Sequence, residues 1–316
     1  MSAFDLIVQG GRVATAADVT TCDIGIKDGR ISALAERLED AGRIIDAAGK
    51  TVTPGGVDGH CHLDQPTTDG SVAADDFVSG TRSAAAGGTT TVIPFALQMR
   101  GHSLHEAIED YHQRATGKAL IDYAFHLIVT DPTAQVCGQE LPALIQDGYS
   151  SFKIYMTYDD MKLDDRQILD VLSVARRHQG MVMIHAENSD CIDWLTDRLE
   201  EAGKIEPRYH ATSRPRPVER EATHRAITLA ELLDVPVLIV HVSAREAVQE
   251  IQRAQARGLK IFGETCPQYL FLTEDDLDKP GFEGAKCMCS PPPRDKENQQ
   301  VIWDGLSNGT FQVLSS

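Results

Sequence analysis

Eight short apolar runs, separated mostly by longer amphipathic stretches, constrain the fold of this chain more than any other feature. The runs have the length of buried strands, and the stretches have the length of crossover helices. Strands joined in this way run parallel and are covered by helices on both faces. The pattern predicts an α/β fold and favours a closed (β/α)8 barrel over an open doubly wound sheet. We expect strands at residues 51–57, 90–95, 121–129, 151–156, 181–185, 235–242, 259–262 and 311–314, and helices at 74–86, 103–116, 139–147, 166–178, 219–233 and 245–258.

The N-terminal segment differs from the rest of the chain in the spacing of its apolar runs. Short strands with Gly-rich turns fill residues 4–53, which is typical of a small β-layer. We therefore divide the chain into an N-terminal β-domain at residues 1–51 and a barrel at residues 52–316. The glycine pairs at 55–56 and 87–88 lack the spacing of a phosphate-binding fingerprint, which argues against a nucleotide-binding doubly wound sheet.

Charge and cysteine content narrow the possible partners. The 316 residues carry 30 Lys and Arg against 47 Asp and Glu, a net charge of −17, whereas nucleic acids and anionic membranes attract clustered basic side chains. No apolar run approaches the roughly 18 residues of a membrane helix, and no secretory signal is visible. The seven cysteines are scattered and odd in number, so we expect reduced thiols in the cytoplasm and neither a nucleic-acid nor a membrane partner.

Histidines stand where three of the predicted strands end. In a barrel of this type the active site lies at the carboxyl ends of the strands. His60 and His62 follow the first predicted strand, and alternation along an extended chain puts both imidazoles on one face. His185 and His241 end the apolar runs of the fifth and sixth strands. One such histidine is more often a core residue, but four at equivalent places predict a site for divalent metal ions.

Lys153 lies inside the fourth predicted strand, SFKIYM at residues 151–156. Alternation places Phe152 and Ile154 on the helix-facing side, so Lys153 points into the barrel, where an unpartnered ammonium is strongly disfavoured. The residues leave three interpretations open: an ion pair with an interior carboxylate, a Schiff-base nucleophile, or an amine carboxylated by CO2. The four histidines favour the last, because a lysine carbamate adds negative charge and two oxygens that can bridge two metal ions.

The order of these residues resembles that of the hydantoinase/dihydropyrimidinase family, a branch of the amidohydrolase superfamily with a binuclear metal centre. Further segments match in the same order along the whole chain. They are PGGVDGHCH (54–62), GGTTT (87–91), SFKIYMTY (151–158), HAEN (185–188), YHATSRP (209–215), ETCPQY (264–269) and SPPPR (290–294).

The resemblance implies hydrolysis of the cyclic amide bond of hydantoins or dihydropyrimidines to N-carbamoyl amino acids. It implies that His60 and His62 bind the more buried of two divalent ions. His185 and His241 would bind the second ion, and Lys153 carboxylated on its side-chain nitrogen would bridge the two. The ions are usually zinc, with manganese or cobalt as alternatives, and the hydroxide between them attacks the substrate carbonyl.

The resemblance also implies two substrate contacts. Tyr158 would donate a hydrogen bond to the developing oxyanion, and Ser290 would hold the cyclic imide through its backbone. A homotetramer is expected, with residues 1–51 forming part of a β-sandwich domain. In the family an aspartate that ligates metal and shuttles a proton follows a motif like LSS at residues 314–316. We therefore hypothesise that the chain is a fragment, with a barrel incomplete after strand eight, and that it is inactive in isolation.

Three alternatives stay open. Dihydroorotase usually carries an arginine soon after His-x-His to hold a carboxylate, whereas Asp64 would repel one. Allantoinase shares the metal ligands but typically lacks the equivalent of Tyr158, so it is the second enzyme candidate. A catalytically inactive tetrameric scaffold is disfavoured, because such relatives have lost ligands that this chain keeps. Residues 64–76, 95–102 and 157–163 resemble the loops that select substrates in the family.

Overall fold

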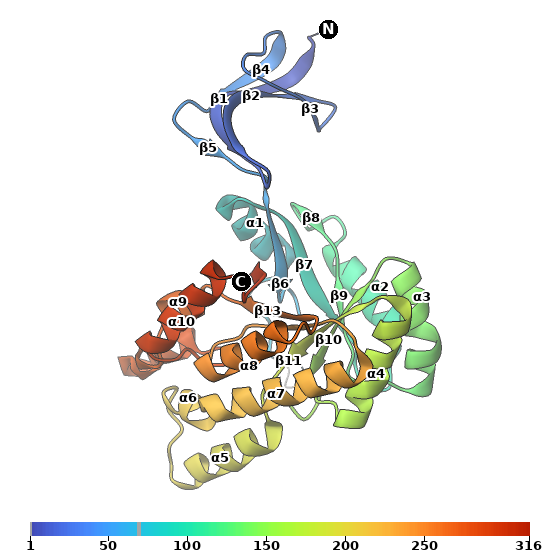
Figure 1. Ribbon diagram of the computed structural model, residues 1–316, viewed down its shortest axis with the longest axis vertical. Coiled ribbons are helices and arrows are strands. Elements are labelled where there is room, and N and C mark those ends of the chain that lie inside the picture. Colours follow the sequence, from blue (N-terminus) through green and yellow to red (C-terminus); the bar gives the residue numbers. More distant parts are fainter. Residues whose placement is uncertain (1, 68–70) are drawn as a thin grey trace. The chain divides into compact units, whose positions relative to one another are not determined.

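The computed structural model describes residues 2–67 and 71–316, which form two compact units (Figure 1). The first unit comprises Met1–Gly56 and the second comprises Val57–Ser316. Each unit has its own β-sheet and its own buried apolar cluster.

The N-terminal unit is a five-stranded sheet with the order β3-β2-β1-β4, in which β5 also pairs with β1. The central β1 runs antiparallel to β2 and parallel to β4 and β5. Its small core contains Val13 and Ile24, while the buried Asp23 accepts hydrogen bonds from the backbone N–H groups of Leu38 (2.9 Å) and Gly10 (2.8 Å). These bonds hold the pKa of the Asp23 carboxyl below its usual value. The strands are β1 (Phe4–Ala14), β2 (Val19–Lys27), β3 (Arg30–Ala35), β4 (Ala41–Asp46) and β5 (Thr51–Val52).

The second unit is a curled parallel sheet wrapped by helices, which confirms the predicted barrel architecture (Figure 1). Its strand order is β6-β7-β9-β10-β11-β12-β13-β14, and β8 pairs with β7. Ser316, which follows β14, donates a hydrogen bond from its hydroxyl to Oδ2 of Asp58 on β6 at 2.6 Å. The two ends of the sheet therefore adjoin. The strands are β6 (Gly56–Cys61), β7 (Thr89–Leu97), β8 (Asp122–Tyr123), β9 (His126–Ile128), β10 (Ser151–Tyr155), β11 (Met181–His185), β12 (Val237–Ile239), β13 (Ile261–Thr265) and β14 (Val313–Leu314).

The helices are amphipathic, and α4 illustrates how the sequence sets their limits. Asp164 caps the first turn in a reciprocal capping box with Gln167, and Gln179 ends the helix in a left-handed conformation at φ +61°. Between them Ile168 and Val171 face the core. The helices and helical turns are α1 (Phe77–Gly87), α2 (Leu104–Ala115), η1 (Val136–Glu140), α3 (Leu141–Gln146), α4 (Asp165–His178), α5 (Ser189–Glu201), α6 (Tyr209–Ser213), α7 (Arg216–Leu233), α8 (Arg245–Ala256), α9 (Gln268–Phe271), η2 (Glu274–Asp278), η3 (Pro280–Cys287) and α10 (Lys296–Ser307).

The first predicted barrel strand, at residues 51–57, was misplaced. Thr51–Val52 belongs to the N-terminal sheet as β5, and the barrel strand begins only at Gly56. Pro54 separates the two, since its nitrogen has no hydrogen to donate to a ladder. The predicted run at 121–129 splits into β8 and β9, and helices α5 and α10 were not predicted.

The two faces of the barrel strands carry different cores. The outer core includes Phe152 and Ile154 of β10 and the inward faces of the helices. The inner cluster includes Phe95, Tyr155 and Met183. The alternation along β10 thus follows the sequence expectation, and it puts Lys153 on the inner face.

Two further findings concern the cysteines and the hydrophobicity of the helices. All seven cysteines are free thiols, as predicted. Cys61, between the two first histidines, packs against the outer core. Within the described residues no helix combines the length and the apolar composition needed to cross a membrane.

Candidate metal and hydrolytic site

The predicted histidines meet in one cavity of about 380 Å³ at the carboxyl ends of the barrel strands. We call it the inner cavity. Ring centroids lie 5.5 Å apart for His60 and His62, 5.3 Å for His60 and His241, and 4.5 Å for His185 and His241. Tyr158 and Ser290 line the same cavity. Its lining residues are His60, His62, Tyr155, Tyr158, Met161, His185, His241, Cys266, Gln268, Tyr269, Cys289, Ser290 and Ser316.

Lys153 lies beside these histidines and is fully buried. Its Nζ is 3.2 Å from Nε2 of His60, and it lies 4.9 Å from the ring centroid of Phe95 and 5.2 Å from that of Tyr155. Burial lowers the pKa of the Lys153 ammonium, and the charge of Glu264 opposes this shift without cancelling it. The neutral amine, which is the form that reacts with CO2, is therefore more accessible here than at an exposed lysine.

Three of the histidines have one ring nitrogen occupied by a neighbour. Nδ1 of His60 is 2.7 Å from Oε1 of Glu264, and Nε2 of His185 is 2.7 Å from Oε2 of Glu187. Nδ1 of His62 contacts the side-chain oxygen of Gln65. An acceptor oxygen fixes the ring proton on the nitrogen it contacts and leaves the other nitrogen as a lone pair. Burial also lowers the pKa of His60 and of His185, which favours the neutral, ligating imidazole.

The fourth histidine has a ring nitrogen with no partner. Nδ1 of His241 is buried and makes no hydrogen bond among the described residues, and the backbone there has φ +40°. A buried polar atom without a partner is costly, and a cation would satisfy it. In the described part of the chain, no three His, Cys, Asp or Glu side chains already stand in a coordinating arrangement. The chemistry of the four imidazoles nevertheless suits divalent transition-metal ions, because neutral imidazole nitrogen is a donor that such ions prefer.

Tyr158 stands at the rim of the inner cavity in a left-handed conformation, φ +69°. Its ring packs against His185 with centroids 5.3 Å apart. Burial raises the pKa of the Tyr158 phenol to about 12, although a hydrogen bond with Ser290 works against the shift. The phenol is therefore a protonated hydrogen-bond donor near neutral pH. Ser290 is itself held by His210, whose Nε2 is 3.3 Å from the serine Oγ and 2.8 Å from the carbonyl oxygen of Cys289.

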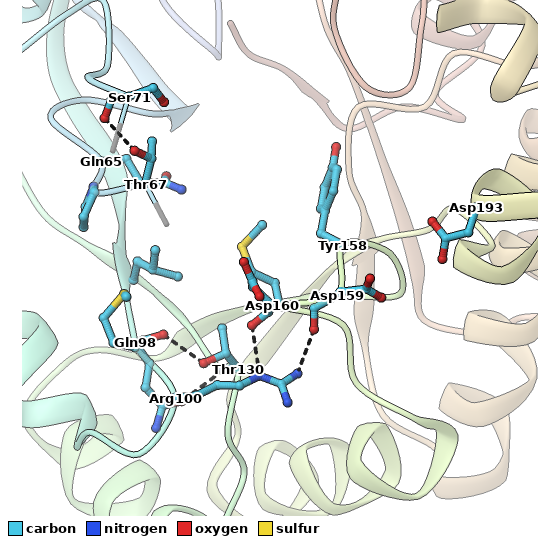
Figure 2. Close-up of a pocket in the computed structure, with 14 residues that line it drawn as sticks. Gln65, Thr67, Ser71, Gln98, Arg100, Thr130, Tyr158, Asp159, Asp160 and Asp193 are labelled. Carbon is cyan, nitrogen blue, oxygen red and sulfur yellow. Dashed lines mark hydrogen bonds between the residues drawn. The ribbon is translucent and has the colours of Figure 1, made fainter. Parts of the chain in front are cut away.

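A second, larger pocket of about 660 Å³ shares Tyr158 and Met161 with the inner cavity (Figure 2). We call it the outer pocket. Most of its lining comes from the three segments predicted to select substrates, while Thr130 follows β9 and Asp193 belongs to α5. Residues 68–70 of the first segment lie outside the described residues. The outer pocket is lined by Gln65, Pro66, Thr67, Ser71, Leu97, Gln98, Met99, Arg100, Thr130, Tyr158, Asp159, Asp160, Met161 and Asp193.

Comparison with known proteins agrees with this geometry. The sequence pattern of the amidohydrolase family matches residues 51–268. A D-hydantoinase of Rhizobium radiobacter is 46% identical over 313 residues, which are 99% of this chain and 68% of the relative. A solved D-hydantoinase structure superposes with a TM-score of 0.96 at 45% identity, covering 99% of this chain and 68% of that one. A dihydropyrimidinase structure from Brevibacillus agri gives 0.95 at 42% identity, covering 98% and 68%.

The chain belongs to the hydantoinase/dihydropyrimidinase family of amidohydrolases. Hydantoinases and dihydropyrimidinases act on cyclic amides, so the sequence-based assignment to the cyclic-amide hydrolases is confirmed. The match runs through both the N-terminal sheet and the barrel, since it covers nearly the whole chain.

The sequence analysis missed two carboxylates, Glu264 and Glu187, that contact the site histidines His60 and His185. Glu264 is fully buried and also accepts a hydrogen bond from the hydroxyl of Ser315 at 2.7 Å. The predicted strand at 259–262 stopped short of it, whereas β13 extends to Thr265. Glu187 follows His185 by two residues, which is a spacing that places both side chains on one face and was a usable signal.

A buried ion pair supports the neighbouring wall. Glu219 of α7 accepts hydrogen bonds from the backbone N–H (2.8 Å) and hydroxyl (2.7 Å) of Ser243, two residues after His241. Arg294 donates from Nη2 to Glu219 at 2.9 Å and from Nε to Ser243 Oγ at 3.0 Å. The three side chains thereby tie the segment after β12 to the segment that begins with Ser290.

Asp64, which in the sequence disfavours dihydroorotase, forms an ion pair in the structure. Oδ1 of Asp64 accepts a hydrogen bond from Nη1 of Arg114 on α2 at 3.1 Å. The paired charge of Asp64 would repel a substrate carboxylate less strongly than a free carboxylate would. His126, which lies outside the set of four histidines, contacts the backbone of β6: its Nε2 lies 3.0 Å from the carbonyl oxygen of Gly59.

Proposed function

We propose that this chain carries the catalytic centre of an enzyme that hydrolyses the cyclic amide bond of hydantoins and dihydropyrimidines to N-carbamoyl amino acids. One observation carries the proposal. Four histidines from the ends of three strands, β6, β11 and β12, line one cavity, and the fully buried Lys153 lies beside them. A protonated tyrosine hydroxyl stands at the rim of the cavity. The family assignment names the same chemistry.

Divalent metal ions are part of the proposal. His60 and His62 would hold one ion, and His185 and His241 the other. Lys153, carboxylated on Nζ, would supply the shared oxygen donors. When bound, such ions polarise a carbonyl group and acidify water.

The remaining residues orient the substrate and stabilise charge. Ser290 would hold the imide edge of the ring, so that the scissile carbonyl faces the histidines. The phenol of Tyr158 would then donate a hydrogen bond to the carbonyl oxygen as negative charge develops on it. Glu264 and Glu187 would accept the ring proton from Nδ1 of His60 and Nε2 of His185, which leaves the other nitrogen of each ring free to bind metal. The net reaction adds water across the ring C–N bond, with OH on carbon and H on nitrogen.

A substrate panel on the full-length enzyme tests the proposal. The values of kcat/KM would be compared for 5-phenylhydantoin, dihydrouracil, allantoin and dihydroorotate. We expect the first two to be preferred by at least about a hundredfold. Preference for dihydroorotate or allantoin would reassign the substrate, and no turnover of any of the four together with absence of bound metal would favour the scaffold alternative.

Four finer features belong to the same proposal. We take zinc as the bound ion, with manganese or cobalt as substitutes, and N6-carboxylation as the state of Lys153. Elemental analysis and intact mass measurement under native conditions test these two. We take a homotetramer and a cytoplasmic location from the family resemblance and the seven free thiols. Light scattering and cell fractionation test them.

A further inference from the structure

Arg100 links the loop after β7 to the turn that carries Tyr158, as Figure 2 shows. Its Nε donates to the carbonyl oxygen of Asp160 at 2.9 Å, and its Nη2 donates to that of Lys162 at 3.0 Å and that of Asp159 at 3.5 Å. All three acceptors belong to one short turn. A planar guanidinium with several donors in a fixed fork suits such a set of carbonyl groups, and a lysine ammonium does not.

The backbone that presents Arg100 is itself firmly held. The side-chain oxygen of the buried Gln98 accepts hydrogen bonds from the N–H groups of Thr130 and Asp131, both at 3.1 Å. Gly101, at φ +83°, donates from its N–H to Oδ2 of Asp131 at 3.0 Å. The Arg100 side chain is exposed. Because the backbone on both sides of it is held by these hydrogen bonds, the side chain reaches the turn from a fixed position.

The turn needs such support, because Tyr158 is a non-glycine residue at φ +69°. The carbonyl oxygen of Tyr158 accepts hydrogen bonds from the N–H groups of Met161 at 2.9 Å and Lys162 at 2.7 Å. Nζ of Lys162 lies 2.5 Å from Oδ1 of Asp159 and donates to the hydroxyl of Ser189 at 3.0 Å. Relaxation of the strained residue would move the tyrosine ring out of the inner cavity, so the bonds that resist it also fix the phenol.

We propose that Arg100 is a positioning residue that holds the Tyr158 hydroxyl where the oxyanion develops. This inference rests on the function proposed above. Arg100 lines the outer pocket and not the inner cavity, so it acts through the turn and not on the reacting atoms. Its contacts go to main-chain oxygens, so these hydrogen bonds do not depend on which side chains stand at positions 159 and 160.

A double-mutant cycle on the full-length enzyme tests the proposal. We expect Tyr158→Phe to lower kcat by about 10²–10³-fold. Arg100→Gln should lower kcat by about tenfold to a hundredfold with KM changed less than about threefold, and Arg100→Lys should fall between it and the wild type. Added to Tyr158→Phe, Arg100→Gln should cost less than about twofold, because the group it positions is gone. Additive losses in the double variant, or an unchanged kcat in Arg100→Gln, would overturn the role.

A second measurement does not depend on turnover. Hydrogen exchange at the amides of Met161 and Lys162 reports the turn directly, and we expect it to quicken at least about tenfold in Arg100→Gln. Arg198→Gln, on the exposed face of α5, is the matched control and should leave both exchange and kcat unchanged. Unchanged exchange in Arg100→Gln refutes the positioning role even if the substrate is another one. Faster exchange in a protein that opens no cyclic amide refutes the proposed function, while the support of the Tyr158 turn by Arg100 stands.

Discussion

The inner cavity and the outer pocket meet at Tyr158, but they are built from different parts of the chain. The inner cavity is lined mainly by residues at strand ends, and the buried Lys153, Glu187 and Glu264 stand around it. The outer pocket is lined by loops, and most of its polar groups are exposed. Groups on buried strands keep their geometry at little entropic cost, while loops can vary without unfolding the barrel. We therefore expect the reaction to depend on the residues of the inner cavity and the substrate preference to depend on those of the outer pocket.

The largest expected effect comes from Lys153, which lies fully buried beside the histidines of the inner cavity. Lys153→Ala should abolish metal binding and lower kcat/KM by on the order of 10³-fold or more, with partial recovery on adding acetate or propionate. Metal content by mass spectrometry and kinetics measure this. Lys260→Ala, on the exposed side of the barrel, is the control. Two metal ions still bound in Lys153→Ala would contradict the bridging role.

Breaking the buried ion pair behind the cavity should cost stability. Glu219→Ala leaves Arg294 buried and unpaired, so we expect the free energy of unfolding to fall by about 3–5 kcal/mol. An exposed pair at the outer pocket, removed by Asp159→Ala, should cost less than about 1 kcal/mol. Urea denaturation compares the two. Equal losses would show that the inner and outer walls do not differ in rigidity as the geometry indicates.

A smaller effect is expected for the carboxylate behind His60. Glu264→Gln keeps a hydrogen-bond acceptor for Nδ1 but loses the charge, so metal affinity should fall by about 10–100-fold. Competition with a chelator measures the affinity. Glu283→Gln, exposed on η3, should leave it unchanged. Wild-type affinity in Glu264→Gln would show that the carboxylate serves only packing.

The smallest effect should come from the outer pocket. Met99→Ala removes an exposed apolar side chain from its wall, so we expect KM for 5-phenylhydantoin to rise by less than about tenfold and KM for dihydrouracil to stay unchanged. Steady-state kinetics with both substrates measures the difference. A loss of kcat for both would move Met99 from selection to catalysis.

Part of the site was accessible from local pattern alone. Alternation along SFKIYM was enough to turn Lys153 inward, and apolar runs ending in histidine marked His185 and His241. The first barrel strand was misplaced because Thr51 and Val52 satisfy a strand pattern equally well in the N-terminal sheet. The alternation of side chains along a strand does not indicate which sheet that strand joins.

The sequence by itself determined the barrel, the order of its strands and the residue types at their carboxyl ends, because hydrophobic periodicity and strand alternation act between near neighbours. Only the tertiary structure decided which groups pair across the fold. Glu264 meets His60, Arg114 takes the charge of Asp64, and Arg100 supports the turn of Tyr158. Along the chain, Glu264 lies 204 positions from His60, and Asp64 lies 50 positions from Arg114. Asp160, whose carbonyl group Arg100 contacts, lies 60 positions from Arg100. Such contacts depend on how strands and loops close in space, and no local spacing encodes them.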